Sequence, residues 1–73
     1  MNRVLIFKTN VDSNYDVTKV NSILSKFPQI KRSTIDLRDV DKVLRVEYGN
    51  NIEMELIINK INQLGYYCEE LPD

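Results

Sequence analysis

The stretch NNIEMELIINKINQLG, residues 50–65, decides the fold because it carries the full pattern of an amphipathic helix. Asn50 is an expected N-cap, and Glu53 follows it at the spacing of a capping box. Gly65 is the expected left-handed stop at the other end. Between them, apolar residues recur at helical spacing and predict one apolar stripe: Met54, Ile57, Ile58, Ile61 and Leu64.

Three stretches outside this helix are typical of strands. The run RVLIF at 3–7 is apolar and rich in branched side chains, which predicts a strand in the middle of a sheet. Alternating residues at 30–37 and 42–48 predict a hairpin whose turn is RDVD, residues 38–41. The run YYCEEL at 66–71 predicts a short closing strand before Pro72.

A second helix is predicted to begin near Asp16 and to end at Pro28. Its apolar stripe consists of Val17, Val20, Ile23, Leu24 and Phe27. The predicted order is therefore strand, helix, strand, strand, helix, strand. This order is typical of an α+β domain of the ferredoxin-like βαββαβ type, a four-stranded antiparallel sheet with both helices on one face.

The other face of such a sheet is open to water or to a partner. Alternation places Val4, Ile6 and Val43 there, beside Arg45. Scattered exposed apolar residues are normal, so this strip is either an ordinary surface or the surface of a homodimer or of another partner.

The totals predict one domain over residues 1–73, with 42% hydrophobic and 29% charged residues, as in soluble folded proteins. Positive and negative charges are interspersed and the net charge is -1, so neither nucleic acid nor a membrane surface is an expected partner. The start of the chain carries neither a membrane span nor a signal peptide pattern, and the expected location is the cytoplasm.

The chain has one cysteine, Cys68, and no histidine. It therefore cannot form an intramolecular disulfide, and it lacks most of the ligands that zinc and copper prefer. A catalytic site is not expected either, because no activated nucleophile, framed carboxylate pair or glycine-rich phosphate loop is present. RNA-recognition domains share the predicted topology, but KVLRVEY at 42–48 lacks their glycine and paired aromatic residues.

Two stretches carry a resemblance to a known family. VNSILSKFPQI at 20–30 and LIINKINQLGYYCEE at 56–70 resemble the two helices, with their closing segments, of heavy-metal-associated domains. These domains occur in copper chaperones and in the N-terminal repeats of copper-transporting ATPases. The resemblance covers nearly the whole chain and implies the same ferredoxin-like fold.

The resemblance fails at the metal loop, which reads Met-x-Cys-x-x-Cys in the family. Val11 takes the place of the methionine, and Ser13 and Asp16 take the places of the two cysteines. Cu(I) is a soft ion held by thiolates, so the family's copper site is not carried over, and neither a metal nor another cofactor is expected.

Two interpretations of this loop remain. In the structural one, Ser13 caps the helix by accepting from the amide of Asp16, while Asp16 reaches back to the amide of Ser13. In the alternative, Asp12, Ser13 and Asp16 form a weak site for a hard cation such as Mg or Ca.

Cys68 and Tyr66 also have two interpretations each. Cys68 is expected to be a buried small hydrophobe, and its alternative is a metal ligand that needs partners from elsewhere, such as a second copy. Tyr66 either covers Val11 as part of the core or contacts a partner. If a partner binds, the first expected surface is Val11, Tyr15 and Tyr66, and the second is the open sheet face.

Two hypotheses of function follow. The first is a metal-independent module for protein interaction or regulation. The second is a metal carrier with non-standard ligands, either the loop oxygens, Cys68 or a site shared across a dimer.

Overall fold

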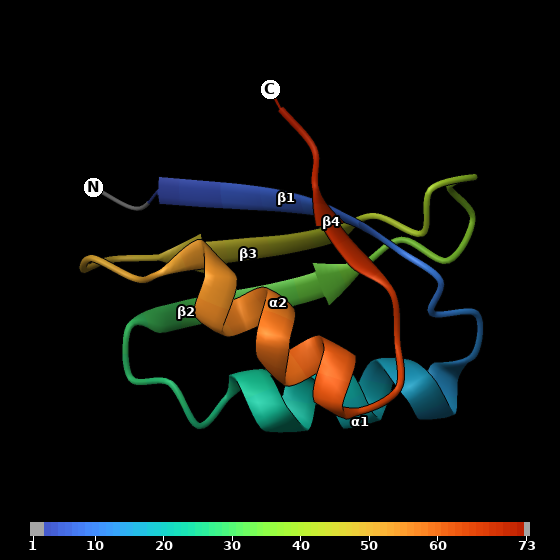
Figure 1. The fold of residues 1–73 in the computed structure, drawn as a ribbon, viewed down its shortest axis with the longest axis horizontal. Helices are drawn as coiled ribbons and strands as arrows, with labels where there is room; N and C mark the ends of the chain where they lie inside the picture. The colour runs from blue at the N-terminus through green and yellow to red at the C-terminus, as the bar shows by residue number, and fades with distance from the viewer. Residues whose placement is uncertain (1–2, 73) are drawn as a thin grey trace.

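A computed structural model describes residues 3–72, so Met1, Asn2 and Asp73 of the predicted domain lie outside the described part. The elements follow the predicted order (Figure 1). They are β1 (Arg3–Thr9), α1 (Asn14–Leu24), β2 (Ile30–Ile35), β3 (Leu44–Tyr48), α2 (Met54–Gln63) and β4 (Cys68–Glu70). Within residues 3–72, no helix is long and apolar enough to cross a membrane.

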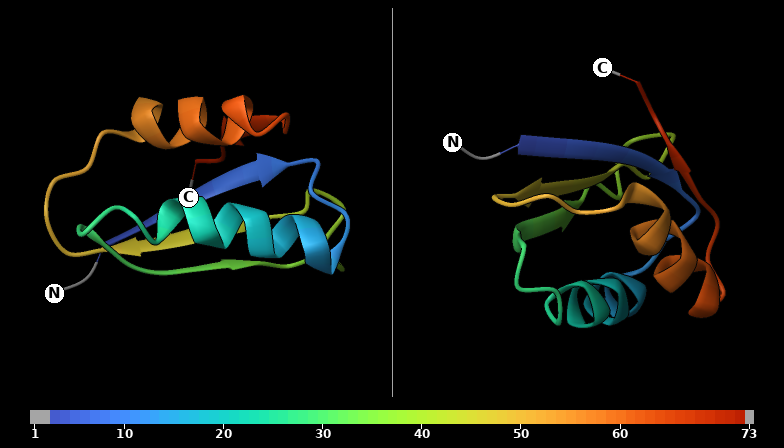
Figure 2. Two further views of the ribbon diagram at one scale, coloured as in Figure 1. Left: turned by 90° about the horizontal axis from the view of Figure 1, so that it is seen from below. Right: turned by 60° about the vertical axis from the view of Figure 1, so that its left-hand side comes forward.

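The four strands form one antiparallel sheet in the order β2-β3-β1-β4. The predicted central position of β1 is confirmed, because it pairs with β3 on one side and with β4 on the other. Both helices lie on the same face of the sheet (Figure 2). The ferredoxin-like α+β fold is therefore confirmed.

The core fills the space between the sheet and the two helices. Phe7 comes from the central strand, and the other fully buried residues come from α1, β3, α2 and, with Val11, the loop before α1. The buried apolar set is Phe7, Val11, Val20, Leu24, Leu44, Val46, Ile57, Ile61 and Cys68. In β1 and β3 the buried residues alternate along the strand, Phe7 with Thr9 and Leu44 with Val46, as a pleated sheet with one covered face requires.

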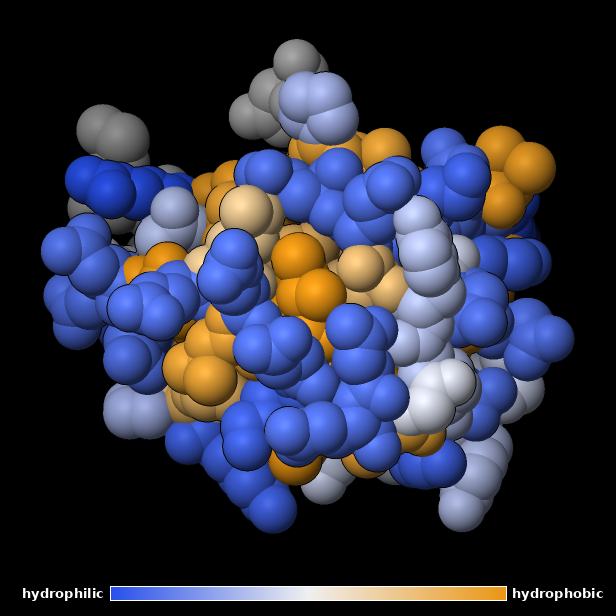
Figure 3. Space-filling model, viewed as in Figure 1, coloured by the Kyte–Doolittle hydropathy of each residue, from blue (hydrophilic) through white to orange (hydrophobic). Residues whose placement is uncertain are grey.

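On the opposite face of the sheet, Val4, Ile6 and Arg45 lie in paired strands with the predicted alternation, whereas the fourth predicted residue, Val43, lies in the β2–β3 loop. Ile6 lies opposite Arg45 and Val4 lies opposite Glu47 in the register of β1 and β3. Val4 and Ile6 are half-buried, whereas Arg45 is exposed. Figure 3 shows the side of the molecule seen in Figure 1, with α2 in front of the sheet, and here hydrophilic residues surround a central apolar area.

The start of α2 differs from the prediction. The N-cap is Glu53 and not Asn50, and its side chain makes no capping hydrogen bond. Ile52 explains the difference, since it packs against the core and the chain stays non-helical until Met54. Burying the side chain of Ile52 stabilises the fold more than an N-cap at Asn50 would.

The β2–β3 connection is longer than the predicted turn at 38–41. β2 ends at Ile35 and β3 begins at Leu44, so residues 36–43 form the loop. Two aspartates fold it: the carboxylate of Asp36 accepts from the N–H of Arg38 at 3.0 Å, and that of Asp39 accepts from the N–H of Asp41 at 2.7 Å. These bonds compete with strand pairing, which explains the shorter strands.

The predicted left-handed stop of α2 is confirmed at Gly65, whose φ is +99°. The N–H of Gly65 donates to the carbonyl of Asn62 at 2.9 Å, and the N–H of Tyr66 donates to the carbonyl of Ile61 at 3.3 Å. This pair of bonds is a Schellman motif, which closes the helix and turns the chain toward β4.

Replacing Gly65 should lower the free energy of unfolding through backbone strain alone. A Cβ at this position would meet no atom within 4 Å, so no clash contributes. We expect Gly65→Ala to cost about 1–2 kcal/mol, the price of a left-handed residue with a side chain. Gly65→Asn should lose less, because asparagine tolerates this conformation; equal losses measured by urea unfolding would contradict the explanation.

Candidate functional site

The site lies at the end of β1, where the loop of residues 10–13 leads into α1. Ser13 is the N-cap of α1, and its Oγ accepts from the N–H of Asp16 at 3.1 Å, as predicted. The predicted second bond of the capping box, from the amide of Ser13 to the carboxylate of Asp16, has a different donor. The carboxylate of Asp16 does not reach the amide of Ser13 but accepts from its hydroxyl, with 2.8 Å between Oγ and Oδ2.

A third side chain completes this contact from the other end of the sequence. The hydroxyl of Tyr66 donates to Oδ1 of Asp16, so both carboxylate oxygens are engaged. Hydrogen bonds from Tyr66 and then from Ser13 lower the pKa of Asp16. The same bond to Asp16 is the main reason that the pKa of Tyr66 is raised.

Lys19 lies between two tyrosines beside this contact. Its ammonium group is 5.4 Å from the ring centroid of Tyr15 and 5.4 Å from that of Tyr66. Both distances suit cation–π attraction. Hydrogen bonding to Tyr66 is the main cause of the raised pKa of Lys19. We call Tyr15, Asp16, Lys19 and Tyr66 the tyrosine–lysine cluster.

The residues of the predicted partner surface differ in exposure. Tyr15 is 72% exposed, and Tyr66 is half-buried. Val11, in contrast, is fully buried. Val11 therefore anchors the loop in the core, and in this conformation its side chain is not available to a partner.

Two further contacts hold the loop in place, and no sequence pattern predicts them. The side-chain oxygen of Asn10 accepts from the N–H of Tyr67 at 2.8 Å, which ties the loop to the segment before β4. The hydroxyl of Thr9 accepts from the N–H of Val11 at 3.3 Å. For Lys19, a signal was present: it follows Tyr15 by four residues, the spacing at which helical side chains meet.

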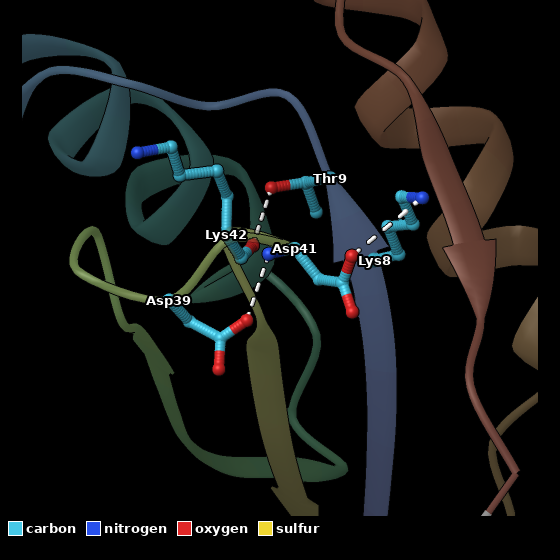
Figure 4. A network of polar contacts seen from close by, with 5 residues as sticks. All are labelled: Lys8, Thr9, Asp39, Asp41 and Lys42. Carbon is cyan, nitrogen blue, oxygen red and sulfur yellow. Dashed lines mark hydrogen bonds and ion pairs between the residues drawn. The ribbon is translucent and has the colours of Figure 1, made fainter.

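Thr9 also connects this loop to the β2–β3 loop (Figure 4). Its hydroxyl donates to the carbonyl of Lys42 at 2.6 Å, and its N–H donates to the carbonyl of Asp41 at 3.0 Å. Lys42 has a positive φ of 46°, and Asp41 forms an ion pair with Lys8 at 3.6 Å. The two loops are thus held together at one end of the molecule.

The donor atoms at this end do not suit Cu(I). Residues 3–72 contain no group of three or more His, Cys, Asp or Glu side chains that could hold a metal ion. Cys68 is buried in the core, and burial raises its pKa to about 12, so the thiol stays protonated near neutral pH. At the loop, Ser13 and Asp16 offer only oxygen, and Cu(I) prefers thiolate sulfur.

Comparison with known proteins gives a clear result for the fold. No protein-family model and no curated protein matches the sequence. Among solved structures, the yeast copper transporter domain Ccc2a matches with 24% identity and a TM-score of 0.84, covering 97% of each chain. A chain of the Atx1–Cu(I)–Ccc2a complex matches with 24% identity and a TM-score of 0.83, again over 97% of each chain.

A bacterial domain matches the same fold. The N-terminal domain of a potential copper-translocating P-type ATPase from Bacillus subtilis, solved in the Cu(I)-loaded state, matches with 14% identity and a TM-score of 0.82. The match covers 100% of this chain and 95% of that domain. At such identities the likeness establishes the fold: this chain has the fold of the heavy-metal-associated domains that it resembles, with Ser13 and Asp16 in the loop and Cys68 as its one cysteine.

Proposed function

We propose that this chain is a cytoplasmic module that binds another protein without metal, through the tyrosine–lysine cluster. The observation that carries the proposal is the contact of Ser13, Asp16 and Tyr66. These side chains close the loop by hydrogen bonds of their own, so a bound ion is not needed to hold it. Nothing in this role calls for catalysis.

The exposed part of the cluster suits protein recognition. Tyr15 presents a large, rigid ring to solvent, and tyrosine is favoured at interfaces because it contributes area at a low entropic cost. The ammonium group of Lys19 lies 5.4 Å from the centroid of the Tyr15 ring, and this cation–π contact should reduce the entropic cost of ordering the ring on binding. A domain of this fold is also found in a two-protein complex, Atx1–Cu(I)–Ccc2a.

The alternative is a metal carrier with non-standard ligands. Its ligands would be the loop oxygens of Asp12, Ser13 and Asp16, or a site shared across a homodimer, or Cys68. Opening the core to expose Cys68 and removing its proton would both oppose such a site. A metal titration separates the two functions.

The titration uses the reduced protein and Cu(I), in competition with a Cu(I) chelator and followed by native mass spectrometry. We expect no stoichiometric uptake by the natural chain, because it offers no accessible thiolate pair. The variant Ser13→Cys with Asp16→Cys should bind one Cu(I), and Ser13→Cys alone should bind far more weakly.

Two outcomes of the titration would reject the proposal. One is tight Cu(I) binding by the natural chain. The other is a fall in its melting temperature when EDTA or the chelator is added, because a ligand that binds only the folded state stabilises it.

The contact of Asp16 with Tyr66 also predicts how stability depends on pH. Because the pKa of Asp16 is lowered in the folded state, its carboxylate stabilises the fold above the usual aspartate pKa of about 3.9, and this contribution is lost as the pH falls through the lowered pKa. Tyr66→Phe and Asp16→Asn should therefore flatten the decline of stability in acid.

Tyr48→Phe is the matched control, since Tyr48 lies at the end of β3 and makes no described contact with Asp16. Urea unfolding between pH 7 and pH 2 measures the effect. An acid limb equally steep in Tyr66→Phe and in the natural chain would show that the loop is held by other contacts.

Binding itself predicts a specific loss. With a partner isolated on the immobilised protein, Tyr15→Ala should weaken capture without unfolding the chain, because the side chain is largely outside the core. Leu56→Ala is the control, as Leu56 is 39% exposed on α2. Capture that is unchanged in Tyr15→Ala and in Tyr66→Ala, or that a chelator abolishes, would contradict the proposal.

A further inference from the structure

We draw no further inference here: the strongest candidate, the outer side of the edge strand β2 (Ile30–Ile35), has both signs of charge beside it, with Arg32 opposite Glu47 in β3, and nothing in the described part of the structure shows what covers it.

Discussion

The central strand β1 is the constraint on which the rest of the structure depends. It pairs on both sides, and its residue Phe7 lies in the middle of the core. Thr9, at its end, is the one buried polar residue in the described core, and both its N–H and its hydroxyl are satisfied by the β2–β3 loop. A buried polar group must find such partners, so the position of two loops follows from the pairing of one strand.

Much of this arrangement could be predicted from local patterns. A few residues each encode the two amphipathic helices, the alternation of the strands and the stop at Gly65, and the structure has all of them. Asn50 shows the limit of such reasoning: the residue type and spacing suit a cap, but the burial of Ile52 keeps the chain non-helical. The ends of β2 and β3 were likewise missed, because the aspartates of the loop bond to their own backbone.

The candidate site was predictable only in part. The capping hydrogen bond from the N–H of Asp16 to the hydroxyl of Ser13 joins residues three apart, so it can be predicted from the local sequence. The bond from Tyr66 to Asp16 joins residues fifty apart in the chain and depends on how α2 ends, and it follows only from the whole fold. Val11 illustrates the reverse error: its place in the loop suggested a contact surface, and the fold buries it.

The burial of Cys68 also makes its thiol slow to react with oxidants and alkylating agents. A thiol with a pKa of about 12 is almost entirely protonated near pH 7, and the thiolate is the form that reacts with oxidants and alkylating agents. Cys68 lies opposite Thr9 where β4 pairs with β1. Its rate of alkylation in the native protein therefore measures how often this edge of the sheet opens, and the chain contains its own reporter of local unfolding.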